Sequence, residues 1–358
     1  MTADPAIAPT AVPTNLPATI RAAMARALEL GRRALGTTSP NPPVGAVILD
    51  SAGRVVSEGH TQPPGGPHAE VVALTAAGPA ARGGTAVVSL EPCDHTGRTG
   101  PCSRALLAAG IARVVYAVPD PNPLAAGGAA TLRAAGVEVS GGLLRAEAER
   151  GALEAWLHCV RTGRPFVTWK YAATLDGRVA AADRTSRWIT GPAARADVHV
   201  LRAEVDAILA GSGTVLADDP QLTVRRPDGS NADRQPLRAV LDRAHRVPRT
   251  ARVFDAAAET VALDAADPHA ALADLHRRGV VSVLLEGGPT LAGAFARAGL
   301  LDRVIGYLAP VLLGAGPTAL GDAGIGTIAG AIRLRIDEVV QLGPDIRVTA
   351  RPATPEED

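Results

Sequence analysis

Segments with strand character and segments with helix character alternate along this chain, and the alternation occurs twice. The first series begins with a helical pattern at 18–35, contains a strand-like segment at 85–90 and ends with a helical pattern at 143–160. The second series begins with a strand-like segment at 166–171 and ends with two strands around a Gly-Pro turn at 334–351. Strands that alternate with helices form a sheet whose faces are largely covered, so the pattern predicts an α/β fold.

The basic segment 161–165, which contains Gly and Pro, separates the two series. A chain of 358 residues has room for two domains, and we expect them at 18–162 and 163–358. Segment 1–17 is rich in Ala, Pro and Thr and has no Lys or Arg, so we expect a disordered tail rather than a targeting signal. Pro and Gly interrupt the uncharged segment 304–321 and break a spanning helix, which predicts a soluble, cytoplasmic protein without membrane contact.

The composition limits the class of partner. Lys plus Arg and Asp plus Glu both total 36, so the formal net charge is zero. A protein that binds a phosphate backbone usually carries a basic excess, so we expect no nucleic-acid partner. Three cysteines in this length exclude a disulfide scaffold and favour a metal site or buried thiols in a reducing compartment.

One imidazole and two thiols form the first chemical motif. His68 stands two residues before Glu70 at the start of a predicted helix, Cys93 follows Pro92 after a strand, and Cys102 begins another helix. This ligand set suits catalytic zinc with an open position for water, whose pKa the metal lowers. Glu70 can then move protons between that water and a leaving amine, as in the zinc-deaminase signature.

The spacing of the cysteines leaves two other interpretations open. Eight residues separate Cys93 from Cys102, whereas the usual zinc-deaminase signature has Cys-x-x-Cys. A structural zinc site with His95 as its fourth ligand is one alternative. Two buried thiols beside an unrelated His-Ala-Glu sequence are the other.

A glycine turn forms the second chemical motif. The strand-like segment 281–286 leads into Gly287 and Gly288, after which Pro289 and Thr290 open a helix. A strand, a glycine turn and a helix N-terminus can together bind phosphate through backbone N–H groups. The motif alone is weak because such turns are common, and it lacks the Rossmann glycine pattern.

The two motifs and their surroundings resemble the bifunctional deaminase–reductase family of riboflavin biosynthesis. The first half carries Pro67-His-Ala-Glu-Val and Leu90-Glu-Pro-Cys-x-His-x-Gly-Arg-Thr-x-Pro-Cys102, and the long cysteine spacing is typical of that family. Further similar strings lie at 40–45, 120–123, 170–178, 186–190, 214–223 and 286–291, so the resemblance extends from about residue 20 to past residue 320. Ser39, Thr61, Asp94 and Thr96 depart from residues common in the family.

The resemblance implies a cytidine-deaminase-like three-layer domain followed by a dihydrofolate-reductase-like α/β domain. It implies that the first domain, with one zinc per chain, deaminates 2,5-diamino-6-ribosylamino-pyrimidinone 5′-phosphate hydrolytically. The second would use NADPH to reduce the ribosyl group of the product to ribityl. The substrate is therefore a small molecule, and the resemblance also implies a homo-oligomer, either a dimer or a tetramer.

The resemblance also assigns roles to individual residues. In the deaminase half, Asn41 would contact the pyrimidine and His95 would lie near the substrate. In the reductase half the substrate positions are Ser186, Arg202, Leu222, Arg225 and Glu286. The nicotinamide-cofactor positions are Ala172, Trp188, Thr214, Asp218, Gly287, Gly288, Pro289, Thr290, Leu291, Ala292, Gly293 and Ala294.

Residue chemistry supports part of this assignment. Arg202 and Arg225 can clamp a 5′-phosphate through paired N–H donors, and Trp188 can pack against a flat ring. Arg243 follows a predicted strand end and could meet the 2′-phosphate of NADPH. Lys170 and Asp176 are candidates for polarising the sugar carbonyl or holding the substrate.

Two other functions remain open from the sequence. One is a nucleoside or tRNA-type zinc deaminase fused to a different nucleotide-binding domain, although zero net charge and 3% aromatic residues argue against a polynucleotide substrate. The other is a non-catalytic binding protein with structural zinc and a nucleotide-sensing domain. One of the two domains could also have lost its activity.

Overall fold

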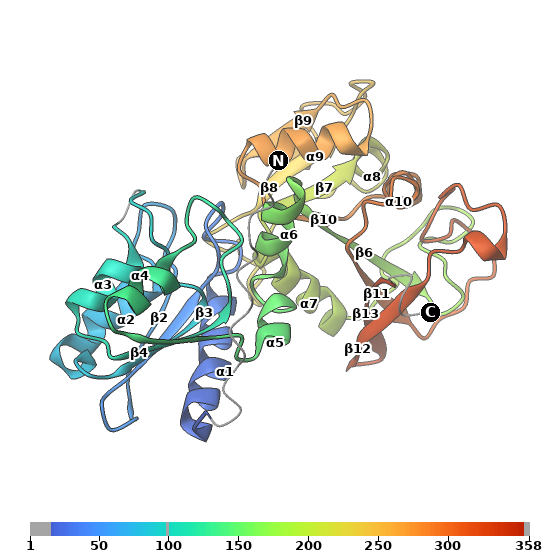
Figure 1. Cartoon of the computed structure of the whole chain (residues 1–358). Helices are drawn as coiled ribbons and strands as arrows, with labels where there is room; N and C mark the ends of the chain where they lie inside the picture. The colour runs from blue at the N-terminus through green and yellow to red at the C-terminus, as the bar shows by residue number, and fades with distance from the viewer. Residues whose placement is uncertain (1–15, 98–99, 354–358) are drawn as a thin grey trace. The chain divides into compact units, whose positions relative to one another are not determined.

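The chain divides into two compact units at Gly163 and Arg164 (Figure 1). The structure is a computed structural model that describes residues 16–97 and 100–353. The expected tail at 1–17 lies, apart from Leu16 and Pro17, outside the described residues. Both units combine helices with a mixed sheet, which confirms the predicted α/β class.

The first unit is built on a five-stranded sheet with the order β2-β1-β3-β4-β5, in which β1 runs antiparallel to β2 and β3, and β3, β4 and β5 are parallel. Its elements are α1 (Ala18–Arg33), β1 (Gly45–Leu49), β2 (Val55–His60), α2 (Ala69–Ala77), η1 (Gly78–Ala81), β3 (Thr85–Leu90), α3 (Cys102–Ala108), β4 (Arg113–Val118), α4 (Gly128–Ala134), β5 (Glu138–Gly141), α5 (Arg145–Glu149) and α6 (Glu154–Thr162).

Helices cover both faces of this sheet, and two glycines allow the close approach. A Cβ on Gly45 would lie 2.0 Å from the carbonyl oxygen of Ala27 in α1, and one on Gly59 would lie 2.4 Å from that of Ala69 in α2. Gly59 pairs with Ala46, the neighbour of Gly45, so α1 and α2 pack on opposite faces. The central strands are therefore almost continuously apolar, and polar groups lie at the strand ends.

The second unit contains an eight-stranded sheet with the order β12-β13-β11-β6-β10-β7-β8-β9, antiparallel at the β12-β13-β11 end and parallel elsewhere. Its elements are β6 (Phe166–Thr174), α7 (Pro192–Ala203), β7 (Ala207–Gly211), α8 (Ser212–Asp218), β8 (Leu237–Leu241), η2 (Arg252–Phe254), β9 (Thr260–Leu263), α9 (Pro268–Arg277), β10 (Ser282–Leu285), α10 (Pro289–Arg297), β11 (Arg303–Ala309), η3 (Ile328–Gly330), β12 (Leu334–Leu342) and β13 (Asp345–Pro352).

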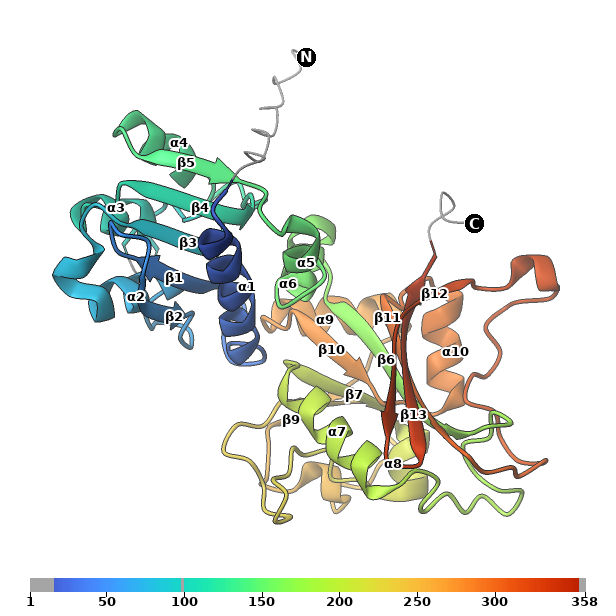
Figure 2. The same ribbon diagram turned by 90° about the horizontal axis from the view of Figure 1, so that it is seen from below.

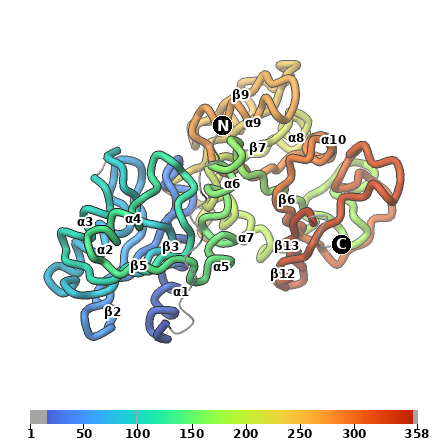
Figure 3. Tube along the Cα trace, viewed as in Figure 1, coloured from blue at the N-terminus to red at the C-terminus, as the bar shows by residue number. Residues whose placement is uncertain are grey.

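Segments far apart in the sequence meet in this second sheet, where β6 lies between β10 and β11. Figure 3 shows the path of the chain through both units. Neighbouring residues of β7 point to opposite faces of the sheet and pack in two different hydrophobic clusters. Leu209 packs with α9 and α10, whereas Ile208 packs with α8 and the nearby end of α7. Figure 2 shows α7 and α10 on either side of the strands.

Four features differ from the sequence-based expectations. Strands β5 and β9 and helix α8 do not emerge from the sequence pattern, and the helical stretch expected at 143–160 is two helices, α5 and α6. Both unexpected strands are short edge strands of four residues, which need no long apolar run. Helix α8 begins with Ser, Gly and Thr, which favour helices weakly, and Val215 anchors it in the core. Gly151 lies in the break between α5 and α6.

Within residues 16–97 and 100–353, no helix combines the length and the apolar character that a membrane span requires.

The contact between Gly45 and α1 gives a stability prediction. We expect Gly45→Ala to lower the free energy of unfolding of the first unit by about 3 kcal/mol, because the new methyl group meets a backbone oxygen that cannot rotate away. Urea unfolding followed by circular dichroism measures the change. Gly100→Ala is the matched control because a Cβ there has open space; equal stability of the two variants would contradict the expected clash.

Candidate active sites

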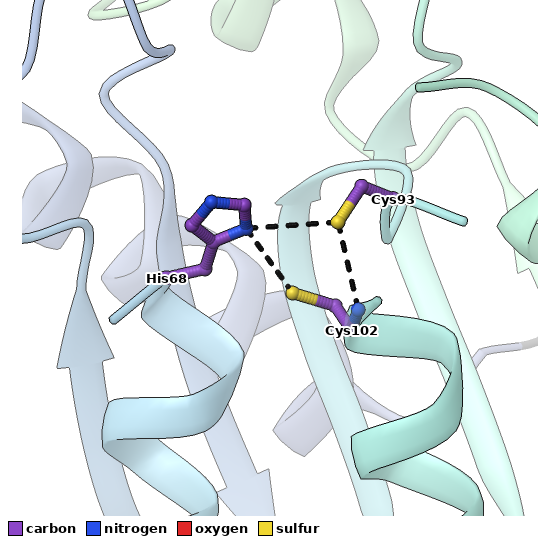
Figure 4. A group of neighbouring side chains, drawn as sticks. All are labelled: His68, Cys93 and Cys102. Atoms are coloured by element: carbon purple, nitrogen blue, oxygen red, sulfur yellow. Dashed lines mark hydrogen bonds between the residues drawn. The ribbon is translucent and has the colours of Figure 1, made fainter. Parts of the chain in front are cut away.

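Three predicted metal ligands converge in the first unit (Figure 4). The Nδ1 atom of His68 lies 3.6 Å from the Sγ atom of Cys93 and 3.3 Å from that of Cys102. All three ligand atoms lie within 4.8 Å of one another. One imidazole and two thiols at these separations fit a zinc ion.

Local structure explains this convergence. His68 immediately precedes α2, Cys93 follows the end of β3, and Cys102 is the first residue of α3 after Pro101. The backbone N–H of Cys102 also donates a hydrogen bond of 3.5 Å to the Sγ atom of Cys93. Two helix starts and one strand end therefore present their ligands to one point.

Glu70 is almost completely buried in the first turn of α2, with 4% of its surface exposed. Burial raises the pKa of its carboxyl group to about 7, which suits a group that takes up and returns a proton near neutral pH. A hydrogen bond from Cys102 and the neighbouring His68 lower the pKa of the Cys93 thiol, whereas the pKa of Cys102 is raised. A metal cation would favour the thiolate form of both cysteines.

The described part of the chain argues against a closed structural zinc site. Within residues 16–97 and 100–353, the group of side chains placed to hold a metal consists of the three ligands above, without His95. His95 is half-buried, and its Nδ1 atom has no hydrogen-bond partner within that part of the chain. Asn41 lies half-buried in the turn after α1, with its N–H bonded to the carbonyl of Thr38, and its pyrimidine contact remains a prediction.

The sequence pattern does not single out Asp120, which lies in the electrostatic neighbourhood of Cys93 and His95. Burial raises the pKa of its carboxyl group to about 6. Its Oδ1 atom accepts a hydrogen bond of 2.8 Å from the N–H of Asn122. The sequence signal that could have marked Asp120 as a site residue is its position two residues after the end of β4 and before Pro-Asn-Pro.

A buried carboxylate organises the second site. The two carboxylate oxygens of Glu286, at the end of β10, accept hydrogen bonds of 2.6 and 3.0 Å from the Nε and one terminal nitrogen of Arg202 in α7. The Nζ atom of Lys170 in β6 lies 3.5 Å from the same carboxylate. Burial alone would raise the pKa of Glu286, but the two cations lower it to about 2, while burial lowers the pKa of Lys170.

The expected phosphate clamp is only partly available. Arg202 uses three N–H groups on Glu286 and on the carbonyl of Thr223, which leaves two of its five for a ligand. Arg225 is exposed, and its backbone N–H donates a hydrogen bond of 3.2 Å to His199. Burial and the two nearby arginines lower the pKa of His199. The sequence shows no partner motif for His199 and predicts a surface or capping group, although His199 lies three residues before Arg202 on α7.

The glycine turn meets the start of α8. Gly288 immediately precedes α10, and its N–H donates a hydrogen bond of 2.9 Å to the Oγ1 atom of Thr214. A Cβ on Gly287 would lie 2.8 Å from the side chain of Leu291. Gly287, Gly288 and Thr214, all predicted cofactor positions, thus lie together, and Pro289 and Thr290 form the first turn of α10 beside them.

Two other predicted cofactor positions have packing roles. Ala292 is completely buried in the core, and a Cβ on Gly293 would lie 2.5 Å from the backbone oxygen of Asp322. Ala294, on the same helix, is half-buried. These residues fix the position of α10, and their contact with the cofactor stays a prediction.

The remaining predicted positions spread over several elements. Trp188 is 70% exposed, and the guanidinium group of Arg195 lies 4.5 Å from its ring centroid. Asp218 ends α8, and its carbonyl accepts a hydrogen bond from Arg187. The other positions are Ala172 in β6, half-buried Ser186 and Leu222 in the core.

Asp176 does not join the Glu286 cluster through any contact that the structure records for it. Its carboxylate accepts hydrogen bonds of 2.5 Å from the hydroxyl of Thr174 and 2.7 Å from the N–H of Gly314. These bonds hold the turn after β6 against the 310–316 loop. Of the two candidates for polarising the carbonyl, Lys170 has the more suitable surroundings.

The structure places Arg246, rather than Arg243, against another element of the cofactor region. Arg246 donates a hydrogen bond of 2.7 Å to the Oγ atom of Ser212, the first residue of α8. Arg243 is exposed in the same turn after β8. Arg246 is exposed as well, so the two arginines differ in this contact and not in burial. The sequence could identify a basic group at this strand end but not which arginine contacts α8.

Comparison with known proteins identifies the family. Residues 17–118 match the cytidine and deoxycytidylate deaminase zinc-binding region, and residues 165–348 match the RibD C-terminal domain. The riboflavin biosynthesis protein RibD of Mycobacterium tuberculosis H37Rv is 52% identical over 324 residues, which cover 90% of this chain and 95% of the relative. The chain belongs to the RibD family. RibD of Escherichia coli K12 is 43% identical over 356 residues, with 90% and 96% coverage.

Solved RibD structures agree with this assignment. Acinetobacter baumannii RibD, form 1, has a TM-score of 0.87 and 40% identity, covering 94% of this chain and 99% of that one. The Thermotoga maritima diaminohydroxyphosphoribosylaminopyrimidine deaminase/5-amino-6-(5-phosphoribosylamino)uracil reductase has a TM-score of 0.86 and 34% identity, with the same coverage.

This member of the RibD family is a bifunctional deaminase/reductase enzyme of riboflavin biosynthesis, and the predicted fold class is confirmed. The match of the second unit to a RibD domain removes the alternative of a different nucleotide-binding domain, and the enzyme family removes that of a non-catalytic binding protein.

The buried ion cluster predicts a pH-dependent loss of stability. We expect Glu286→Gln to lower the free energy of unfolding at pH 7 by about 3 kcal/mol, because Arg202 and Lys170 lose their counter-charge. The folded pKa of Glu286 is about 2, below its ordinary 4.5, so its contribution is complete above pH 4.5 and disappears as the pH falls towards 2.

Urea unfolding followed by tryptophan fluorescence, at pH 7 and at acid pH, tests this. The advantage of the unsubstituted protein over Glu286→Gln should shrink between pH 4.5 and 2. The matched control is Asp322→Asn, which removes an exposed partner of Arg297 and should change stability by less than about 0.5 kcal/mol. A pH-independent difference would refute the electrostatic origin.

Proposed function

We propose that residues 18–162 form a hydrolytic deaminase with one zinc ion and that residues 163–358 form an NADPH-dependent reductase. The observation that carries the first half is the convergence of His68, Cys93 and Cys102 beside a buried Glu70. The substrate we propose is 2,5-diamino-6-ribosylamino-pyrimidinone 5′-phosphate. Water replaces one ring amine, which leaves as ammonia.

His68, Cys93 and Cys102 would hold the zinc ion, which when bound lowers the pKa of a water molecule. Glu70 accepts a proton from the attacking water and donates one to the leaving amine. Its raised pKa of about 7 suits both transfers, because neither the charged nor the neutral form is strongly disfavoured. Asn41 and His95 contact the pyrimidine from the neighbouring turns.

In the reductase, NADPH when bound would supply a hydride to C1′ of the ring-opened ribosylamine, where the C1′=N double bond becomes the C–N single bond of the ribitylamine. Lys170 polarises that double bond and delivers a proton to its nitrogen, since the ammonium group is buried and held at the end of a charged cluster. Glu286 orients both Lys170 and Arg202. Arg225 and the remaining N–H groups of Arg202 bind the 5′-phosphate, with Ser186 and Leu222 shaping the substrate site.

We place the cofactor on the elements that meet at the glycine turn. Gly287, Gly288 and Thr214, which lie in contact, would hold the pyrophosphate, and Ala172, Trp188 and Asp218 would hold the nicotinamide end. Arg243 and Arg246 follow the end of β8 and bind the 2′-phosphate, which favours NADPH over NADH.

A cytoplasmic location agrees with the chemistry of the cysteines. Cys93, Cys102 and Cys159 carry thiols rather than disulfide bonds, and the proposed zinc site requires two of them to remain reduced.

A coupled assay with separating variants tests the two activities. Ammonia release and NADPH consumption are followed on the zinc-loaded enzyme given the proposed substrate. Glu70→Gln should lower ammonia release by about 10²- to 10⁴-fold while zinc content stays equal, and Lys170→Met should lower NADPH consumption by a similar factor while ammonia release stays unchanged.

Each variant is the control for the other, because both keep the whole chain. NADPH consumption by Glu70→Gln should recover when the deaminated intermediate is supplied. Failure of Glu70→Gln to consume NADPH on the supplied intermediate, or loss of ammonia release by Lys170→Met, would contradict the separation of the two sites, and ammonia release at the normal rate by Glu70→Gln would overturn the role of Glu70.

We propose that the protein is a homodimer that uses the exposed face of the β12–β13 hairpin. Leu334, Ile336, Val339 and Ile346 are exposed, and the strand register puts them on one face. Strand β12 is also the edge of the sheet. A second copy can cover the same face through two-fold symmetry, since an apolar patch on an edge strand favours self-association.

Sedimentation velocity at micromolar concentration tests the dimer. We expect Ile336→Asp with Val339→Asp to give monomers, whereas Leu124→Asp, which charges a still more exposed apolar residue of the first unit, should leave the dimer unchanged. A monomeric unsubstituted protein would overturn the proposal.

A further inference from the structure

The two thiol ligands come from separate parts of the chain, and the chain between them is long. Cys93 follows β3 and Cys102 begins α3, with eight residues in between. In a Cys-x-x-Cys turn the short connection itself holds both sulfur atoms. Here a further interaction must hold the two ligand-bearing backbones together.

Asp94 supplies such an interaction. It directly follows Cys93, and its Oδ1 atom accepts a hydrogen bond from the hydroxyl of Ser103, which directly follows Cys102. Its Oδ2 atom accepts a hydrogen bond of 2.6 Å from the hydroxyl of Thr131 in α4. One carboxylate therefore connects the residues next to both thiol ligands and fixes them to a third element.

Backbone contacts support the same arrangement. The N–H of Ser103 donates a hydrogen bond of 3.2 Å to the carbonyl of Cys93, and the N–H of Asp94 donates one of 2.9 Å to the carbonyl of Ala125. Helix α4 packs so closely that a Cβ on Gly128 would lie 1.8 Å from the carbonyl oxygen of Pro92. The segment that carries Cys93 is thus held between α3 and α4. The Cys93 sulfur accepts a hydrogen bond from α3 and the Glu91 carboxylate one from α4, whereas the Asp94 carboxylate accepts hydrogen bonds from both helices.

We infer that Asp94 is a positioning residue that keeps the two thiols at a separation suited to one metal ion and thereby slows metal loss. The inference rests on the proposed zinc site. Groups that orient metal ligands typically change metal affinity by about 10- to 100-fold when removed. Ser103 and Thr131 take part as the donors, so each should show part of the effect.

Zinc release to a coloured chelator, measured by stopped flow on the intact zinc-loaded protein, tests the inference without relying on activity. We expect Asp94→Ala to release zinc about 10- to 100-fold faster than the unsubstituted protein. Asp94→Asn keeps the shape and one acceptor oxygen, so it should restore most of the retention. Thr131→Val should give a smaller increase than Asp94→Ala, because the Ser103 bond remains.

Asp50→Ala is the matched control. Asp50 also accepts several hydrogen bonds, from Ala52 and Arg54. It lies at the other end of the strands from Cys93, since Leu49 pairs with Thr85 at the start of β3. Its zinc release should equal that of the unsubstituted protein. NADPH consumption on the deaminated intermediate confirms that each variant is folded in its second unit.

The possible results separate the two proposals. Failure of the unsubstituted protein to bind zinc would overturn the proposed zinc site itself. Normal binding with unchanged release from Asp94→Ala, or equal release from Asp94→Ala and Asp50→Ala, would overturn the role of Asp94. If Asp94→Ala does not fold, Thr131→Val decides, and release at the unsubstituted rate from that variant would also overturn it.

Discussion

Coverage of both faces of each sheet is the constraint on which the positions of the functional groups depend. Once α1 and α2 enclose the first sheet, and α7, α8, α9 and α10 the second, a charged or metal-binding side chain within the central strands is costly unless a counter-charge lies beside it, as Glu286 does for Lys170 in β6. The strand ends remain. Cys93 follows the end of β3, and Glu286 follows the end of β10.

The two sites solve different electrostatic problems. In the first unit, burial raises the pKa of Glu70 to about 7, so its proton is mobile near neutral pH. In the second, two buried cations keep Glu286 charged, so it serves as an anchor rather than a proton carrier. The same residue type thus has opposite behaviour because its neighbours differ.

The sequence predicts the parts of this structure that repeat a local rule. Apolar runs such as 85–90 mark the covered strands, and the ligand chemistry of His68, Cys93 and Cys102 marks the metal site, because imidazole and thiol groups at strand ends and helix starts have few other uses. The residues of the reductase site were predicted mainly from the resemblance to the family and not from a local rule of the sequence. Short edge strands carry no such signal, and neither does helix α8, which depends on the packing of Val215.

Contacts between distant residues were beyond the sequence for a different reason. Whether Arg243 or Arg246 contacts the start of α8 depends on the path of one loop. The hydrogen bonds between Arg202 and Glu286 depend on the pairing of β10 with its neighbours. Asp94 looks like a minor departure from the family until Ser103 and Thr131 appear beside it.

Helix α6 ends at Thr162 and strand β6 begins at Phe166, so the two catalytic units share one polypeptide with only a few residues between them. Ribosomes must therefore make both activities in a one-to-one ratio, and gene dosage cannot favour either. Any imbalance between the flux through the first step and that through the second has to be corrected by evolution of the rate constants of the sites themselves. A cell in which the deaminated intermediate accumulates can respond only by changing turnover, not by changing the number of reductase copies.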